Sequence, residues 1–256
     1  MMKGSKRRWL RKGGSDLVGL VNFMNGAKSS FKLLIFSVAL GGCVAAPQSA
    51  GESLGQLDRG SGKPGILLMP LDVELSETGA GGLPVPREDW TRQAERHIAR
   101  VLGEQMNRRS ARLIHYIPPG NDPEKTARRA QLVKLHEAVG LSIIRHKLTD
   151  GARLPGKADK FDWSLGPSVR ELAREFDTNY ALFVLMRDTY ASAGRIASIV
   201  LQGAGTGDGQ LGFSSLVDLR DGNISWFNLL ARPEGDLRTL AAARKSVGAM
   251  MGNFPR

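Results

Sequence analysis

Two continuous apolar runs, at positions 66–69 and 180–186, constrain the fold of this chain most strongly. A strand that packs on one face alternates apolar and polar side chains, whereas these runs contain no charged position. Each run is therefore predicted to be a β-strand buried on both faces. A sheet that contains such strands must be covered on both sides, which favours an α/β fold with helices packed on a mixed sheet.

Helices that could cover the sheet are evident from the spacing of apolar residues. Residues 87–107 carry apolar side chains at helical intervals and predict an amphipathic helix with its arginines outward. A second helix is expected after Asn121, the predicted N-cap, with Pro123 in its first turn and Gly140 as its end. Further helices are predicted from Pro167 and over 240–254.

The remaining strands follow from alternating patterns and turn residues. Pro70 interrupts the first strand, so residues 71–75 are expected to be a bent continuation of it. Asp221-Gly222 predicts a two-residue hairpin turn. Other strands are predicted over 111–117, 196–202, 211–219 and 223–230. The chain therefore ends in an antiparallel meander and a closing helix.

The only cysteine of the chain, Cys43, follows a short apolar segment. Residues 33–40 fit the apolar region of a signal peptide, because they are too few to span a bilayer and follow a basic flank. Leu40-Gly41-Gly42-Cys43 resembles a bacterial lipobox, in which the thiol is acylated and the preceding bond is cut. We predict a signal peptide over 1–42, with Met24 as an alternative start; a short core helix or an ordinary buried thiol are the alternatives.

The predicted lipidation of Cys43 implies a membrane location. More than one acyl chain anchors a protein stably, whereas one chain binds only marginally. No Asp follows the cysteine, so the resemblance to an inner-membrane retention signal is missing. We therefore predict an anchor in the outer membrane, on its periplasmic side.

Removal of the signal peptide changes the charge of the protein. The whole chain carries a formal net charge of +11, which is typical of nucleic-acid binders. Residues 1–42 hold eight Lys/Arg and one Asp, so that 28 Lys/Arg and 24 Asp/Glu remain, a net charge of +4. We therefore expect no nucleic-acid partner.

The mature chain is predicted to consist of a tether and one domain. Residues 43–63 are poor in apolar side chains and predict a flexible tether after the lipidated cysteine. Residues 64–256 are expected to form a single α/β domain. With the one thiol acylated, no disulfide can form, so the hydrophobic core must hold this domain together.

Three stretches of this chain resemble a family of proteobacterial envelope lipoproteins. They are Ile66-Leu67-Leu68-Met69-Pro70, the helix-to-strand unit over 165–183, and the closing segments 216–228 and 253–255. The chain is more distantly similar to the curli-secretion lipoprotein and to the amino-terminal domain of the Tol translocation protein. This resemblance implies an anticodon-binding-like α/β fold and an accessory or assembly role in the envelope.

Polar residues follow the two apolar strands and suggest a ligand cleft. Asp72 and Glu74 come after the first strand, and Arg187, Asp188 and Tyr190 come after the second. If the strands are parallel neighbours, these five residues lie at the carboxyl end of the sheet, where open α/β sheets bind ligands. The simpler alternative is a structural ion pair such as Arg187–Asp72.

A glycine-rich segment between two predicted strands is a candidate interaction loop. It contains Gly203, Gly205, Gly207, Asp208 and Gly209. A phosphate-binding glycine loop opens a helix, whereas a strand follows here. We therefore interpret the segment as a hairpin tip and a candidate contact surface for a partner.

No arrangement of residues indicates catalysis. His97, His115, His136 and His146 lack the spacing of a metal site, and we expect them on helix surfaces or partly buried. The sequence has no Gly-x-Ser-x-Gly nucleophile elbow and suggests no Ser–His pair. We predict no catalytic residue, no metal and no cofactor.

The expected function is that of a non-enzymatic outer-membrane lipoprotein that binds another envelope component or forms a homo-oligomer. One alternative is a periplasmic ligand-binding protein or hydrolase that uses the predicted cleft. Another is a basic nucleic-acid binder that retains residues 1–42, although it would lack the aromatic residues among basic ones that single-strand binders use.

Overall fold

The computed structural model describes most of the chain after position 50. The described residues are 51–53, 57–58, 62–148, 154–157, 160–192, 209–230 and 235–255. The strands are β1 (Gly51–Ser53), β2 (Gly65–Leu68), β3 (Asp72–Thr78), β4 (Pro84–Pro86), β5 (Arg112–His115), β6 (Tyr180–Ala191), β7 (Gly209–Asp218) and β8 (Ile224–Leu230). The helices are α1 (Glu88–Arg108), α2 (Pro123–Ile143), α3 (Arg170–Phe176) and α5 (Leu240–Met250), with a π-helical turn at Ile144–Leu148 and 3-10 turns at Pro155–Lys157 and Pro167–Val169.

The strands form one mixed sheet, as the sequence predicts. Its order is β1-β8-β7-β6-β2-β5, and β3 also pairs with β6 while β4 pairs with β3. Strands β2 and β3 run parallel to β6, and β5 runs parallel to β2. Strands β6, β7 and β8 form the antiparallel meander. The predicted strand over 196–202 lies outside the described residues.

Strands β2 and β3 lie end to end along one side of β6 and form a single bent strand. Leu68 pairs with Leu182 and Asp72 with Leu185, so the bent strand has one residue more than β6 between these pairs. Pro70 lies in this bulge, where its missing backbone N–H breaks no ladder hydrogen bond. The predicted bent continuation is confirmed.

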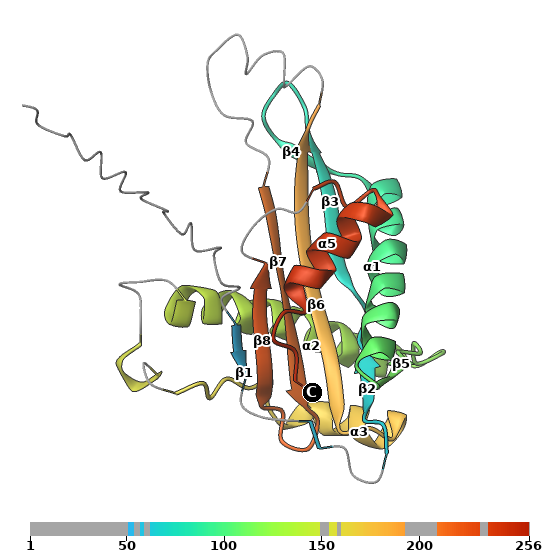
Figure 1. The fold of residues 1–256 in the computed structure, drawn as a ribbon, viewed down its shortest axis with the longest axis vertical. Coiled ribbons are helices and arrows are strands. Elements are labelled where there is room, and N and C mark those ends of the chain that lie inside the picture. Colours follow the sequence, from blue (N-terminus) through green and yellow to red (C-terminus); the bar gives the residue numbers. More distant parts are fainter. Residues whose placement is uncertain are drawn as a thin grey trace, which may run out of the picture. The chain divides into compact units, whose positions relative to one another are not determined.

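Strand β6 is buried on both faces, as its apolar sequence predicts. Leu182 and Val184 belong to the core beneath α1 and α5, whereas Phe183 and Leu185 belong to the core beneath α2 and α3. Figure 1 shows α5 in front of the sheet and α2 behind it. Each such side chain contributes about 1.5–3 kcal/mol when it is fully buried. The cover on both faces therefore stabilises the central strand.

The predicted amphipathic helices are confirmed, except that the closing helix ends at Met250 rather than at 254. In α1, the stripe of Ala94, Ile98 and Val101 is buried. The outward-facing arginines of this helix are Arg92, Arg96 and Arg100, and all three are exposed. In α5, Ala243 and Val247 are fully buried, and Val247 packs in the same core.

Helix α2 differs from the prediction at both ends. Its N-cap is Asp122 rather than Asn121, and the carboxylate accepts the N–H of Lys125 at 2.8 Å. The helix also continues through Gly140. A Cβ atom at this position would lie 2.1 Å from the ring of Phe213 on β7. Glycine here permits the helix to approach the sheet closely instead of ending the helix.

The tether predicted over 43–63 does not extend over its described residues, because these belong to the folded domain. Gly51–Ser53 form β1, which pairs antiparallel with residues 226–228 of β8. Leu57 is only 7% exposed and packs in the core beneath α1 and α5. The backbone N–H of Asp58 donates to the hydroxyl of Tyr180 at 3.0 Å. Pairing of this kind uses backbone groups, so it needs no apolar pattern in the sequence.

The segment predicted as a surface loop over 149–164 is packed at its end. Phe161 is 7% exposed, and the carbonyl of Trp163 accepts the N–H of Ile224 at 2.9 Å. The side chain of Phe161 belongs to the core beneath α2 and α3. This part of the segment therefore extends the edge of the sheet beside β8.

The turn between β7 and β8 is longer than the two residues predicted. The N–H of Asp218 donates to the carbonyl of Asn223 at 2.8 Å, so four residues lie between the paired positions. Gly222 has a φ of +88°, and a Cβ atom there would lie 2.1 Å from the carbonyl oxygen of Gly166. The position therefore requires glycine both for its backbone and for the contact with the neighbouring loop.

Candidate functional site

The five residues predicted to share one cleft lie on opposite faces of the sheet. Successive side chains of a strand point to opposite faces. Arg187 pairs in register with Glu74, and together with Asp72 these residues face α2. Asp188 and Tyr190 face the other side, where Trp90 of α1 contacts Tyr190. The single cleft predicted from the sequence is therefore wrong, because the sheet passes between its two halves.

On the α2 face, the charged residues form an ion-pair network. Arg187 donates from Nη2 to Oδ1 of Asp72 at 2.7 Å and from Nη1 to the carbonyl of Asp72 at 2.8 Å. Glu137 of α2 lies 3.4 Å from Arg187 and 3.1 Å from Lys134. Glu74 is exposed and forms no ion pair with any residue of the described ranges. The simpler alternative, an Arg187–Asp72 ion pair, is confirmed.

On the opposite face, Asp188 is the centre of a buried polar cluster. Its side chain accepts hydrogen bonds from the hydroxyl of Tyr190 and, at 2.7 Å, from Nε2 of Gln210. The residue is 5% exposed, and this burial raises the pKa of its carboxyl group to about 6. The hydroxyl of Tyr190 also accepts the N–H of Leu237 at 2.9 Å. Burial and the neighbouring Asp188 raise the pKa of Tyr190 above its usual value.

Arg238 covers this polar cluster. Its guanidinium lies 4.2 Å from the ring centre of Trp90 and 4.7 Å from that of Tyr190. Asp236 holds the guanidinium from the other side at 2.7 Å, and this hydrogen bond lowers the pKa of Asp236. Asp188 could exchange a proton near pH 6, but the groups around it leave little access for a substrate. We therefore interpret the cluster as a structural one.

An apolar groove lies on the α2 face, at the carboxyl ends of β2 and β5. It has a volume of about 360 Å³. Its lining residues are Pro70, Leu71, Asp72, Tyr116, Pro118, Pro119, Thr126, Arg129, Ala130, Val133 and Lys134. Ile117, which follows β5 closely, is 70% exposed. Of the predicted site residues, only Asp72 lines this groove, which lies where open α/β sheets bind ligands.

Arg129 lies at the wall of the groove and is nearly completely buried. Its side chain is 3% exposed, with Nη2 at 2.7 Å from Glu175 and Nη1 at 3.3 Å from Glu171. Its Nε has no hydrogen-bond partner among the described residues. Two carboxylates from α3 therefore neutralise a buried cation on α2, and together they fix the position of α2 on the domain.

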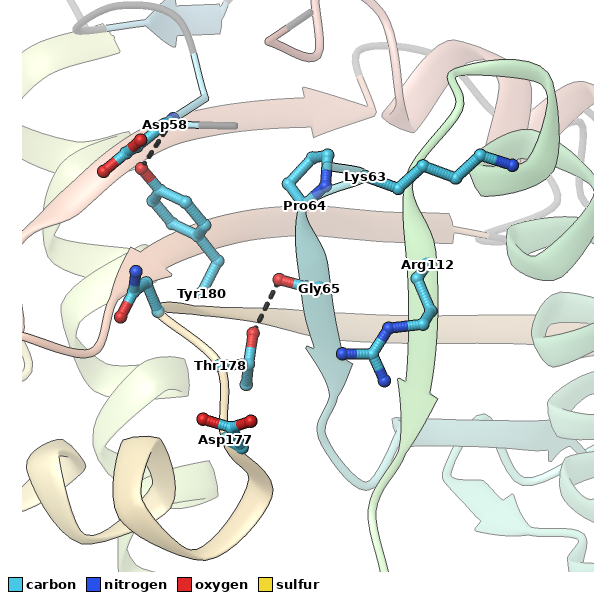
Figure 2. Close-up of a pocket in the computed structure, with 9 residues that line it drawn as sticks. Asp58, Lys63, Pro64, Gly65, Arg112, Asp177, Thr178 and Tyr180 are labelled. Carbon is cyan, nitrogen blue, oxygen red and sulfur yellow. Dashed lines mark hydrogen bonds between the residues drawn. The ribbon is translucent and has the colours of Figure 1, made fainter. Parts of the chain in front are cut away.

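A second, polar pocket of about 300 Å³ lies at the amino ends of β2 and β6. Figure 2 shows Arg112 on one side of β2 and Thr178 with Asp177 on the other, while Lys63 extends away from Asp177. The hydroxyl of Thr178 donates to the carbonyl of Gly65 at 2.6 Å and closes the floor of the pocket. Because Lys63 points away from the other charged groups, the pocket is a weaker candidate site than the groove.

Sequence reasoning missed a buried His–Ser pair. Nε2 of His136 lies 2.9 Å from the hydroxyl oxygen of Ser215, and the ring stacks on Phe183 at 5.0 Å. Burial lowers the pKa of His136 to about 3. The histidine is 1% exposed and Ser215 is fully buried, so no substrate can reach either of them. The position of His136 on the buried stripe of α2, four residues from Leu132, was the available signal.

Several predicted features fall wholly or partly outside the described residues. They include Cys43, Gly203, Gly205, Gly207 and Asp208, whereas Gly209 is the exposed first residue of β7. Among the described residues, no group of three or more His, Cys, Asp or Glu side chains is placed to hold a metal ion. The described helices include none with the length and apolar character needed to cross a bilayer.

Comparisons with known proteins give one structural likeness. No protein-family model matches the sequence, and no curated protein matches it. Among solved structures, a chain of a PelC dodecamer from Paraburkholderia phytofirmans is 14% identical, with a TM-score of 0.35. The match covers 82% of this chain and 99% of that chain. A likeness at this TM-score supports no statement about function.

Proposed function

We propose that this chain is a lipid-anchored envelope protein whose α/β domain binds another envelope component without catalysing a reaction. The lipobox-like Leu40-Gly41-Gly42-Cys43 after a short apolar run carries the proposal. Cys43 would hold the acyl chains after removal of residues 1–42, in the outer membrane and facing the periplasm. The absence of a second cysteine in the sequence leaves the thiol free for this modification.

The apolar groove at the ends of β2 and β5 is the proposed partner-binding surface. Leu71, Val133 and the three prolines give it an apolar lining, and the exposed Ile117 extends this character beyond it. Lys134 at its wall could pair with acidic groups of a partner. Apolar centres with charged margins are typical of protein–protein interfaces.

Intact-mass measurement of protein extracted from the membranes of a Gram-negative host tests the anchoring. We expect a chain that starts at Cys43 and carries acyl mass. A Cys43→Ser variant should yield an uncleaved, unacylated chain. An unmodified full-length chain in the soluble fraction would contradict the anchoring and restore the net charge of +11, which would make nucleic-acid binding the next assay.

Photo-crosslinking from inside the groove tests the partner surface. A crosslinking residue at Ala130, which is exposed in the groove, should give an adduct in native membranes, whereas one at the exposed Arg92 of α1 should not. The adduct should be lost when Val133→Asp places a charge in the groove. Equal adducts from both positions, or an adduct that survives Val133→Asp, would show that the groove is not the partner surface.

A small apolar ligand is the second candidate occupant of the groove. The observation that favours it is the volume of about 360 Å³, which lies in the range of small-molecule pockets. Native mass spectrometry of the purified protein would detect a bound molecule. A ligand that disappears in the Val133→Asp variant, without any protein adduct, would favour this candidate.

A further inference from the structure

We infer that the partner binds as an extended polypeptide segment that adds a strand to the free edge of β5. The inference rests on the proposed partner-binding function and deepens it, because it names the chemistry of the partner. The segment hydrogen-bonds to the backbone of β5 and places an apolar side chain in the neighbouring groove. Extended peptides bind exposed sheet edges in this way in many protein complexes.

Strand β5 is an edge of the sheet. It pairs with β2 and is the last strand in the sheet order. None of its four residues is buried, in contrast to most of β6. The N–H of Arg112 donates to the carbonyl of Pro64 at 2.9 Å, and the N–H of Tyr116 donates to the carbonyl of Leu68 at 3.2 Å. These bonds fix which backbone groups of β5 face β2.

The other backbone groups of β5 face away from the sheet. Along a strand, successive residues direct their N–H and C=O groups to opposite sides, so Leu113 and His115 face the free edge. Neither of these residues has a backbone hydrogen bond to any other described residue. A row of unpaired N–H and C=O groups is a template for pairing with another chain.

Prolines protect the edge of β4 but not that of β5. The N–H of Arg87 donates to the carbonyl of Leu75 at 2.8 Å, so by alternation Pro84 and Pro86 face outward, where they have no N–H. Proline and charged side chains at an edge prevent unwanted pairing. Strand β5 contains no proline, and its only arginine folds back toward Gly65 of β2 (Figure 2). The edge of β5 is therefore open to an added strand.

The apolar groove continues this edge. Tyr116, Pro118 and Pro119 follow β5 and line the groove together with Ala130 and Val133 of α2. The side chain of Tyr116 packs on the α2 face of the sheet. Because side chains alternate along a strand, every second side chain of an added strand faces α2 and lies beside the groove. One extended segment can therefore use both the free backbone groups and the apolar lining.

The charges at the amino end of β5 favour an acidic residue in the partner segment. Lys63 and Arg112 line the polar pocket, are exposed, and form no ion pair with a described residue. Of the two carboxylates that line the same pocket, Asp58 pairs with Arg220 at 3.4 Å, and Asp177 has no ion-pair partner in the described ranges. The unpaired charges thus comprise two cations and one anion. Complementary charges of this kind steer association and fix the register of a complex.

A proline at an outward position of β5 tests the strand addition. The full-length chain carries the crosslinking residue at Ala130, and the readout is the yield of its adduct in native membranes. His115→Pro removes an outward N–H, whereas the matched His115→Ala keeps it. We expect His115→Pro to lower the yield about tenfold and His115→Ala to leave it nearly unchanged. Equal yields from both variants would overturn the inference and leave the groove as the partner surface.

A second pair of variants covers the case in which His115→Pro does not fold, which thermal melts would show. Ile117 is 70% exposed and occupies the next outward position, so Ile117→Pro should fold, and Ile117→Val is its control. Loss of the adduct only in Ile117→Pro supports strand addition, and its survival there overturns it. An adduct between two copies of this chain would overturn the separate partner. No adduct in the wild type would contradict the proposed function itself.

Reversal of one charge tests the acidic residue of the segment. Arg112→Glu should lower the yield several-fold, whereas Arg96→Glu at an exposed position of α1 should not. Equal yields in these two variants would overturn the acidic character of the segment.

Discussion

At the residue scale, His136 shows how a polar side chain can be part of an apolar core. Its ring packs between Phe183 and Phe213, and the hydroxyl of Ser215 is its hydrogen-bond partner. Such a site accepts only the neutral imidazole, because a buried positive charge without a carboxylate is costly. Protonation of His136 should therefore lower the stability of the domain rather than change an activity.

The pKa of His136 predicts a loss of stability in mild acid. The folded-state pKa of about 3 lies below the ordinary 6.5, so stability is complete above pH 6.5 and falls as the pH decreases toward 3. Between pH 7.5 and 5 this residue should lower the free energy of unfolding by about 2 kcal/mol. Urea titrations of the wild type and of His136→Phe with Ser215→Ala should show a weaker pH dependence in the variant. The same pH dependence of the free energy of unfolding in both proteins would contradict a low pKa for His136.

Asp188 predicts the opposite dependence on pH. Its folded-state pKa of about 6 lies above the ordinary 3.8, so its contribution to stability is complete below pH 3.8 and is lost as the pH rises through 6. Asp188→Asn keeps an oxygen that can accept from Tyr190 and Gln210 and removes the buried charge, so we expect equal or higher stability at pH 7.5. Asp188→Ala removes the carboxylate that accepts from both donors and should cost about 1–3 kcal/mol. Thermal melts of both variants at pH 5 and 7.5 check this; equal effects of Asn and Ala would contradict it.

At the scale of elements, close packing decides how α2 lies on the sheet. At Gly140 the ring of Phe213 occupies the space that a side chain would fill, so the helix approaches the sheet closely there. The same helix is held at its other half by the ion pairs of Arg129 with Glu171 and Glu175. The position of α2 thus depends on one small residue and one buried cation.

Two glycines in helix interiors should respond in opposite ways to the same substitution. Gly140→Ala would place a Cβ 2.1 Å from Phe213, and displacement of the ring or the helix should cost about 1–3 kcal/mol. Gly103→Ala on α1 meets nothing within 4 Å, so its better helix propensity should stabilise the protein by about 0.5–1 kcal/mol. Urea unfolding measures both. Similar changes in the two variants would mean that the contact with Phe213 is not tight.

At the scale of the whole molecule, the segment after the predicted lipidation site completes the fold. Strand β1 adds an edge to the sheet beside β8, and Leu57 then fills the core beneath α1 and α5. Residues 51–53 and Leu57 are therefore part of the folded domain rather than of a linker that precedes it.

Leu57 provides a direct test of whether this segment is part of the folded domain. Its side chain is 7% exposed, so Leu57→Ala should lower the free energy of unfolding by about 2 kcal/mol or more. Lys63→Ala, at an exposed position in the same segment, should change it by less than about 0.5 kcal/mol. Chemical unfolding of both variants decides the matter. No effect of Leu57→Ala would mean that the segment is a free tether after all.

The sequence by itself determined the elements that depend on local pattern. The apolar runs at 66–69 and 180–186 required strands covered on both faces, and the apolar spacing in α1 and α5 supplied the cover on one of them. Pro70 predicted the bend between β2 and β3, because a residue without an N–H cannot take part in a regular ladder. These features follow from each residue's own chemistry and from its near neighbours.

Only the tertiary structure decided which distant residues meet. Residue alternation in β6 placed Arg187 and Asp188 on opposite faces, so the predicted cleft divided into an ion pair and a buried cluster. Gly140 met Phe213 rather than ending its helix, and polar residues 51–53 became a strand because β8 offered free backbone groups. Such contacts join residues that are far apart in the sequence, and backbone pairing leaves no pattern in side chains. For this reason the groove beside Asp72 became visible only in the folded domain.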